Sequence, residues 1–429
     1  MNVFRARVWN GLGGCVLSAL PLVCDAGGAE ATTTPTQPAE VVDQGGELGG
    51  EWGGEGGIHP SSYLLYSSNP DAFNYDARPQ QRTYAELVYR SYQDAERQAR
   101  RMQRRIRALL AHPSASRLET ARRAWLAARP SYLLTETFRF YDGPIDIDPV
   151  TGQPGPEIHL NAWPLNEAFI DYVRGAPQAG LIQDVSVPLT RDSLTARDQM
   201  TDESDVTTGW HAIEFLLWGQ DFSTDTAGKR PYTDYVAGDP VRERRRAYLE
   251  LATQMLVENL AALVQHWSPR TNDNYRARFQ ALAPREALGR MLNGMANLAG
   301  YEVASERLAV ALDSGDQEDE HSCFSDNTHN DHLYDLLGIR RVYEYGGATS
   351  LRALARRRDP AIAEHLDQLF DRTENALRAI PQPFDRMLAS SPGSEARGRA
   401  EVAVQSLQDL TRALRDLGKS LGVLVIVSG

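Results

Sequence analysis

The sequence predicts an all-α fold of two helical domains in tandem. Apolar residues recur at helical spacing over long stretches, and helix-start signals precede several of these stretches. The alternation of apolar and polar residues that marks a half-buried strand is scarce. With 429 residues, of which 42% are hydrophobic, the chain is long enough to bury two cores.

Individual helices are predicted from their start signals and their periodic stretches. Residues 84–110 form the first long periodic stretch, and the segment from Ser116 to Glu119 is typical of a capping box at the start of the next helix. Asp239 precedes Pro240, and Asp359 precedes a second proline. Each pair predicts a capping aspartate before a proline at the first helical position. Further helices are expected over residues 285–312 and 395–421.

Two segments rich in glycine, proline and aspartate interrupt this helical pattern, at residues 141–156 and 219–235. The second lies near the middle of the chain and is the predicted domain boundary. We therefore predict an N-terminal helical domain over residues 61–230 and a C-terminal helical domain over residues 231–429.

The first 26 residues are predicted to be an export signal. Arg5 and Arg7 give a positive start, residues 8–23 are largely apolar, and small residues follow. Two outcomes remain open: plain cleavage near Ala26 or Ala29, and lipidation at Cys24. Residues 27–60 are rich in Gly, Thr, Pro, Gln and acidic residues, which predicts a disordered linker. These features predict a protein of the periplasm or cell envelope, attached to the membrane only through an N-terminal lipid anchor, if it has one.

Charge and cysteine content exclude several classes of protein. Lys and Arg number 45 against 57 Asp and Glu, so the net charge of −12 would repel phosphate backbones, and we expect no nucleic-acid partner. Of the three cysteines, Cys15 and Cys24 lie in the export signal and Cys323 stands alone. Disulfides therefore cannot hold the fold together.

The first candidate site residues are His211 and Glu214. On a helix they lie three residues apart on one face, so an imidazole and a carboxylate could meet at one metal ion. The spacing also fits an intrahelical hydrogen bond, and His332 with Asp335 repeats it. The flanking residues are almost all apolar, which predicts a buried helix. Because a buried carboxylate and imidazole are costly unless paired or metal-bound, we take His211 and Glu214 as candidate metal ligands.

Two further polar clusters are candidate parts of a site. Within residues 135–146, Glu136 and Arg139 are spaced to form an ion pair across one helical turn. Residues 318–332 form an acidic loop that also contains Cys323 and Phe324, which a wholly solvated loop would not need. The potential ligands of this loop are Glu318, Asp319, Glu320, His321, Cys323, Asp326, His329, Asp331 and His332.

Residues 135–146, 161–172, 209–221 and 317–329 together resemble the imelysin-like family, also called the M75 peptidase family, and in particular its iron-regulated protein A branch. The resemblance implies a secreted or lipid-anchored bacterial envelope protein of two four-helix-bundle-like domains, linked to iron uptake, with a site where the domains meet. By position, His211 and Glu214 match the Gly-x-His-x-x-Glu motif of the family. His321, Ser325 and Asp326 fall in its acidic-His-Ser-Cys block.

The resulting hypothesis is a metal-binding protein that takes up iron or an iron complex between its two domains, with no catalytic residue. Zinc remains an alternative metal, and a membrane iron transporter is the expected partner. We expect the acidic loop to converge with His211 on one pocket, and the buried Glu214 to face a cation, Arg139 or Arg307. The residues expected to line this site are Glu136, Arg139, Glu302, Arg307, His321, Ser325 and Asp326.

The alternative function is a zinc-dependent metallopeptidase that uses the His-x-x-Glu motif. Such an enzyme typically needs three protein ligands and a separate general base beside the bound water. The chain has no His-Glu-x-x-His motif, and Glu214 cannot easily act as both ligand and base. A purely structural envelope scaffold is the third possibility, favoured if the helix around His211 is ordinary core.

Overall fold

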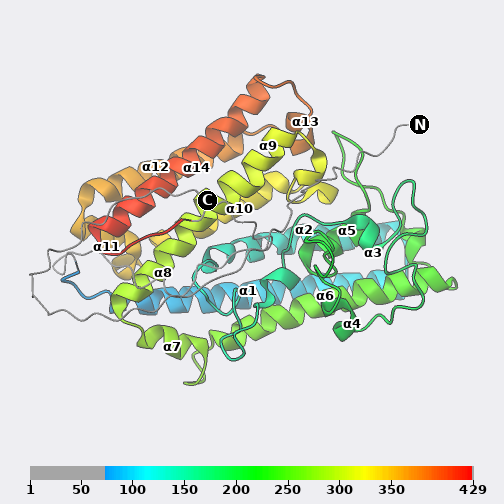
Figure 1. Ribbon diagram of the computed structural model, residues 1–429, viewed down its shortest axis with the longest axis horizontal. Coiled ribbons are helices and arrows are strands. Elements are labelled where there is room, and N and C mark those ends of the chain that lie inside the picture. The colour runs from blue at the N-terminus through cyan, green and yellow to red at the C-terminus, as the bar shows by residue number, and fades with distance from the viewer. Residues whose placement is uncertain (1–72, 428–429) are drawn as a thin grey trace, which may run out of the picture. The chain divides into compact units, whose positions relative to one another are not determined.

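The computed structural model describes residues 73–427, and the regular secondary structure of this part of the chain is helical (Figure 1). Between residues 73 and 427 the only β contacts are two isolated bridges, at Ile147–Pro154 and Val173–Ala176. The predicted all-α fold is confirmed. The predicted export signal and linker, residues 1–26 and 27–60, lie outside the described residues. No helix of the described part is both long enough and apolar enough to cross a bilayer.

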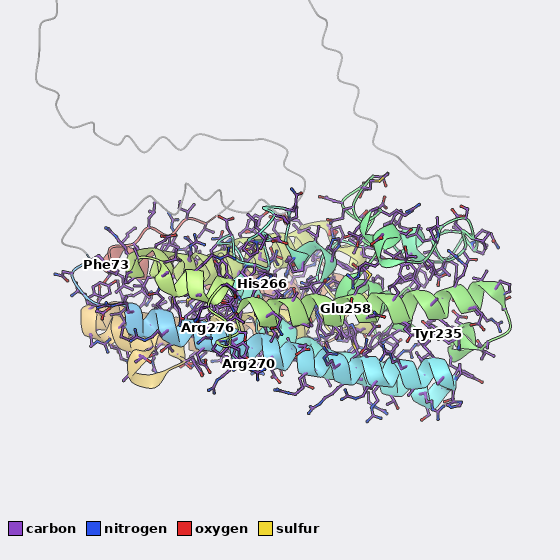
Figure 2. The ribbon with its side chains drawn as sticks, turned by 90° about the horizontal axis from the view of Figure 1, so that it is seen from below. Phe73, Tyr235, Glu258, His266, Arg270 and Arg276 are labelled. Carbon is purple, nitrogen blue, oxygen red and sulfur yellow. The ribbon has the colours of Figure 1, made fainter. Side chains whose placement is uncertain are left out.

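One group of helices surrounds α1 (Arg78–Ala111). Both α2 (Ala115–Leu133) and α6 (Pro240–His266) pack along it, and α5 (Gly209–Trp218) packs against α2 and α6. Figure 2 shows α6 lying alongside α1. Arg276 of α7 (Tyr275–Ala281) donates a hydrogen bond of 2.8 Å to the carbonyl oxygen of Ala85, which fastens α7 to α1.

The second group gathers around α14 (Glu395–Ser420), which packs against α12 (Pro360–Ala379), α8 (Pro284–Asn297) and η6 (Leu298–Ala309). α10 (Thr328–Glu344) contacts α12, η6 and also α2, so it connects the two groups. The domain boundary near residues 219–235 stays a prediction. The remaining helices are η3 (Glu136–Phe138), η4 (Pro156–His159), α3 (Glu167–Ile170), α4 (Arg191–Thr195), η5 (Tyr232–Tyr235), α9 (Val310–Ser314), η7 (Gln317–Asp319), η8 (Cys323–Ser325), η9 (Gly347–Thr349), α11 (Leu351–Arg358) and α13 (Phe384–Leu388).

Two of the three predicted helix starts are confirmed. The Asp239 carboxylate accepts hydrogen bonds from the first turn of α6, and the Asp359 carboxylate accepts one from the first turn of α12. The predicted capping box at Ser116 is wrong by two residues. Helix α2 begins at Ala115, and the Ser114 hydroxyl accepts the hydrogen bond from the Arg117 amide, because the backbone is extended at Ser114 and already helical at Ser116.

The helix predicted over residues 285–312 runs continuously through α8, η6 and α9, but its middle part, η6, is π-helical. In a π-helix the hydrogen bonds join residues five apart, so side chains at this spacing meet on one face. Glu302 and Arg307 have this spacing, and their carboxylate and guanidinium groups lie 2.6 Å apart. The wide turn thus directs an ion pair from η6 toward the site described below.

A tight turn after η3 depends on Asp146. Phe140 and Asp142 have positive φ angles of 66° and 56°, and the Asp146 carboxylate accepts hydrogen bonds from the Tyr141 and Gly143 amides at 3.3 and 3.2 Å. Burial raises the pKa of Asp146 to about 7, against the lowering effects of Arg139 and these amides.

Because the folded protein holds a proton on Asp146 more tightly than the unfolded chain does, this residue should make the free energy of unfolding fall as the pH rises from about 4 to about 7. The full effect is at most on the order of 4 kcal/mol, and less where water reaches the partly buried carboxylate. Urea unfolding across this range should show a flatter curve for Asp146→Asn. Asp148→Asn is the control, since hydrogen bonds to the backbone lower the pKa of Asp148 and place its effect below pH 4. Parallel curves for the wild type and Asp146→Asn would contradict the assignment.

Candidate functional site

The helix that carries His211 and Glu214 is completely buried, as the sequence predicts. Its first residue, Gly209, has a φ angle of 97°, and a Cβ atom there would lie 2.6 Å from the carbonyl oxygen of Leu160. The Trp210 amide donates a hydrogen bond of 2.7 Å to the same oxygen. Glycine is therefore required where α5 begins against the segment around residue 160, and this contact fixes the position of the helix.

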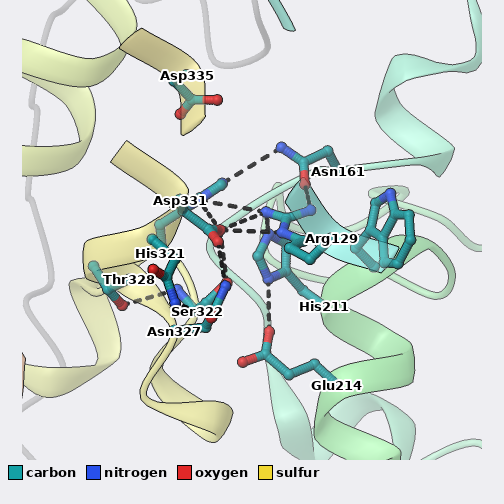
Figure 3. Close-up of polar contacts among 12 residues, drawn as sticks. Arg129, Asn161, His211, Glu214, His321, Ser322, Asn327, Thr328, Asp331 and Asp335 are labelled. Carbon is teal, nitrogen blue, oxygen red and sulfur yellow. Dashed lines mark hydrogen bonds and ion pairs between the residues drawn. The ribbon is translucent and has the colours of Figure 1, made fainter. Parts of the chain in front are cut away.

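His211 and Glu214 contact each other directly (Figure 3). The Nδ1 atom of His211 lies 3.0 Å from the Oε2 atom of Glu214. The other carboxylate oxygen of Glu214 accepts hydrogen bonds from the backbone amide and the hydroxyl of Ser325, at 3.0 and 2.6 Å. The acidic loop therefore reaches the α5 pair, and the predicted convergence of these two segments is present.

The guanidinium of Arg129, on α2, faces the other side of the His211 ring (Figure 3). Its Nη2 atom lies 3.3 Å from His211 Nε2 and 2.7 Å from the Asp331 carboxylate, and its Nη1 atom donates to the Asn161 side-chain oxygen. Arg129 and Asp331 are both fully buried. The Arg129–Asp331 ion pair thus joins α2 to α10 beside the imidazole.

His321 completes this cluster from the acidic loop. Its Nδ1 atom lies 2.9 Å from the Asp331 carboxylate, and its ring centroid lies 4.7 Å from that of His211. The Trp163 ring lies against both imidazoles, at 4.8 and 6.4 Å between centroids. Ser322 donates a further hydrogen bond to Asp331 at 2.8 Å. The cluster is closed on all sides by protein.

The contacts determine which imidazole nitrogens carry protons. Arginine can only donate, so His211 Nε2 accepts, and its Nδ1–H donates to the Glu214 carboxylate. Burial alone would raise the pKa of Asp331, but Arg129 and His321 together hold it well below its usual range, so this carboxylate accepts from His321 Nδ1. Burial lowers the pKa of His321 to about 4 and that of His211 well below its ordinary value. Both rings are therefore neutral at pH 7.

Burial also raises the pKa of Glu214 to about 8, while the Ser325 hydrogen bonds act in the opposite direction. In either protonation state Oε2 can accept from His211 Nδ1–H, because a proton on Glu214 can lie on Oε1 and be donated to the Ser325 hydroxyl oxygen. The carboxylate orients the imidazole, with Nε2 directed at the guanidinium.

A second buried ion network adjoins the first. The Arg307 guanidinium lies 2.6 Å from Glu136, 2.6 Å from Glu302 and 2.8 Å from Asp335. The Asn161 amide donates to Glu136 at 2.8 Å and thereby links both networks. Arg139 lies 3.3 Å from Glu157 and 3.6 Å from Glu302, but 3.9 Å from Glu136, so the predicted Arg139–Glu136 pair is the longest of these contacts.

The structure brings most predicted site residues into these two networks. His211, Glu214, His321 and Ser325 lie in the first, and Glu136, Arg139, Glu302 and Arg307 lie in the second. Glu214 takes its hydrogen bonds from Ser325 and His211, whereas Arg307 pairs with Glu136, Glu302 and Asp335. Asp326 lies apart, with carboxylate oxygens of Asp221 and Asp385 within 4.8 Å.

Sequence reasoning missed Arg129, Asn161 and Ser322. Arg129 stands in an arginine-rich helix, where it looks like its exposed neighbours. The signal that distinguishes it is its position four residues after Trp125 and three before Tyr132, on the buried face of α2. Asn161 and Ser322 carry no local signal of this kind.

The Arg129 guanidinium also bears on metal binding. An ion bound to His211 Nε2 would lie about 2.0–2.2 Å from that atom. The guanidinium nitrogen is only 3.3 Å away, so His211 can take a metal only if Arg129 moves. Among residues 73–427, Asp221, Asp326 and Asp385 are the one set of three or more potential His, Cys, Asp or Glu ligands whose atoms lie within 4.8 Å of one another.

Histidines and carboxylates from several helices and loops meet in the buried centre of this all-α fold. The chain is therefore a helical protein with a polar site between its helices. Residues 88–414 match the family model described as Imelysin, peptidase family M75, and the chain belongs to this family. The iron-regulated protein A of Synechococcus elongatus (strain ATCC 33912 / PCC 7942 / FACHB-805) is 26% identical over 337 residues, which cover 76% of this chain and 81% of the relative.

Two solved structures share the fold. A protein of Parabacteroides distasonis ATCC 8503, described as an iron-regulated protein A precursor, superimposes with a TM-score of 0.63 at 18% identity, over 84% of this chain and 99% of its own. An imelysin-like protein of Psychrobacter arcticum 273-4 gives a TM-score of 0.56 at 15% identity, over 82% and 99%.

The buried ion pair generates a stability prediction. Arg129→Met leaves the Asp331 carboxylate buried without its cation, so we expect the free energy of unfolding to fall by about 3–5 kcal/mol. Adding Asp331→Asn to this variant should recover part of the loss, because the unpaired charge is then gone. Urea unfolding in a double-mutant cycle measures the coupling.

Arg123→Met is the matched control on the same helix. Arg123 is exposed and lies 3.7 Å from an exposed Glu119, so its replacement should cost less than about 1 kcal/mol. Strictly additive losses from Arg129→Met and Asp331→Asn would show that the two charges do not depend on each other.

Proposed function

We propose that this chain is an exported envelope protein that binds iron, as an ion or in a complex, at the cluster of His211, His321 and Asp331. The iron-related role is supported by membership of the Imelysin family and by a relative named iron-regulated protein A. Export is supported by the predicted signal at residues 1–26 and by a structural relative described as a precursor. A membrane iron transporter would receive the cargo.

The observation that carries the proposal is the set of groups around the Arg129 guanidinium. Two imidazoles, one carboxylate and one amide oxygen surround this positive charge: His211, His321, Asp331 and Asn161. Nitrogen and oxygen ligands of this kind suit iron, zinc and manganese. Arg129 thus occupies a position that suits a cation. A metal that displaced it would meet His211 Nε2, the Asp331 carboxylate and the Asn161 oxygen, and His321 would join them after its ring turns, since its Nδ1 proton points to Asp331.

In this proposal Glu214 orients a ligand instead of binding the metal. Histidine ligands usually donate their second ring nitrogen to a carboxylate, which fixes the ring and makes the other nitrogen a better ligand. Glu214 and Ser325 provide this arrangement for His211. Because the Arg129 side chain must move before a metal can bind, part of the binding free energy is used for this movement. The apparent affinity for the metal is therefore lower.

Metal analysis tests the site. Full-length protein purified without chelator and reloaded with Fe²⁺ should hold about one equivalent of metal, and the double variant His211→Ala/Glu214→Ala and the single variant His321→Ala should lose it. His365→Ala, at an exposed histidine, is the control and should bind as the wild type does. Fe²⁺ should also restore stability to Arg129→Met, because the metal replaces the missing charge. Equal metal content in the wild type and the double variant would overturn the site.

The metallopeptidase alternative makes a separate prediction. His211 and Glu214 have no solvent exposure, which does not favour a site that must admit a peptide chain. In an assay supplemented with Zn²⁺ we expect no cleavage of insulin B chain or of casein. Cleavage that is reproducible, is abolished in Glu214→Gln and is retained in His365→Ala would favour the peptidase function over iron binding.

A further inference from the structure

Four carboxylates from three separate segments meet at a second place in the protein. Asp221 follows the end of α5, Glu320 and Asp326 flank η8 in the acidic loop, and Asp385 lies on α13. Oxygen atoms of Asp221, Asp326 and Asp385 all lie within 4.8 Å of one another. The Asp326 carboxyl is within hydrogen-bonding reach of the other two, and the Glu320 carboxyl is within reach of Asp385. We call these four residues the carboxylate cluster.

The cluster lacks donors that would neutralise it. Asp385 is only 2% exposed, and neither of its oxygens has a hydrogen-bond partner. Glu320 is fully buried, and its carboxyl lies against Asp385 although it is not one of the three closest acids. Its Oε1 atom has no hydrogen-bond partner. One oxygen of Asp221 and one oxygen of Asp326 also lack a hydrogen-bond partner. Buried polar atoms are normally satisfied, so these oxygens indicate a missing positive partner.

Arginine and lysine do not supply this partner in the described part of the chain. None of the salt bridges between residues 73 and 427 involves the four carboxylates, and the neighbours that most affect Asp326 are Asp385 and Asp221 themselves. Arg386, next to Asp385 in sequence, pairs instead with the exposed Asp225. Burial and mutual repulsion raise the pKa of Asp326 to about 8, and burial raises the pKa of Asp221. In the absence of a cation, only shared protons can neutralise the cluster.

We propose that the carboxylate cluster of Asp221, Glu320, Asp326 and Asp385 is a second metal site, which binds a hard divalent cation of the Ca²⁺ type. An all-oxygen, carboxylate-rich ligand set selects hard cations over metals that prefer imidazole or thiolate. Ca²⁺ accepts six to eight oxygen ligands, several of them carboxylates, in a flexible geometry, whereas Mg²⁺ keeps several waters and is usually held by one or two carboxylates. A group of three carboxylates within 4.8 Å of one another, with a fourth beside them, therefore favours the larger ion. Asp326 is partly exposed, so the ion can enter from solvent.

The site would tie together three segments, two of which, α5 and the acidic loop, contribute side chains to the His211 centre. Asp326 directly follows Ser325, whose hydroxyl and amide bind Glu214, and Glu320 directly precedes His321. Asp221 follows the end of the helix that carries His211. A cation here would hold the acidic loop against α5 and α13, and would keep Ser325 and His321 in position. The inference is independent of the proposed iron function, since it uses none of the His211 ligands.

The test uses the full chain, freed of metal with EGTA, and Ca²⁺ alone as the probe. Calorimetric titration should show one stoichiometric site, and Ca²⁺ should raise the melting temperature. Asp385→Asn and Asp326→Asn should each weaken the affinity by more than about tenfold, since even the loss of a group that only supports a ligand costs that much. Asp225→Asn removes an exposed carboxylate nearby and should leave binding unchanged.

Stability without metal provides a second readout. Because Asp385 has no donor in the metal-free protein, Asp385→Asn should keep or raise the melting temperature in EGTA while it removes the Ca²⁺ response. His211→Ala should leave the Ca²⁺ response intact, so the calcium site can be tested separately from the iron site. The absence of stoichiometric Ca²⁺ binding to the wild type, or equal loss of binding in Asp385→Asn and Asp225→Asn, would overturn the proposal.

Discussion

The buried Arg129–Asp331 ion pair is the interaction on which the centre of this protein depends. A guanidinium without solvent is tolerated only where its charge and its donors are satisfied, and Asp331, Asn161 and His211 together satisfy them. The pair joins α2 to α10, the helix that contacts both groups of helices. Burial keeps both imidazoles neutral, with the enclosed Arg129 charge acting in the same direction, and this charge helps to keep Asp331 ionised.

The protein contains two kinds of buried polar group, one with compensated charges and one without, and the acidic loop contributes to both. Around Arg129 and Arg307 every carboxylate has a cationic or amide partner, so the charges compensate one another within the protein. Around Asp385 the acids face one another without such a partner. The acidic loop belongs to both regions, since Ser325 binds Glu214 while the next residue, Asp326, points into the carboxylate cluster. Any group that changes the order of this loop therefore acts on His321 as well.

Much of this architecture could be predicted because the determining signals are local. The apolar surroundings of His211 predict a buried helix, and Asp239 and Asp359 mark helix starts through short-range capping. The features that escaped prediction depend on contacts between distant segments. Nothing near Arg129 in sequence indicates that Asp331 will meet it, and Asp385 lies 59 residues beyond Asp326 on a helix of its own. The Gly-x-His-x-x-Glu motif lies in the buried polar cluster around Arg129, but its spacing alone does not say whether Glu214 binds a metal or orients an imidazole.

The π-helical segment η6 makes the length of one helix part of the site. In a regular α-helix each residue turns the chain by about 100°, so residues five apart point about 140° away from each other. Glu302 and Arg307 meet only because the wide turn removes most of that difference. A wide turn of this kind accommodates an additional residue, while the segments before and after it, α8 and α9, stay α-helical. It also makes neighbours of two residues five apart, so a search for helical ion pairs limited to positions three or four apart would overlook Glu302 and Arg307.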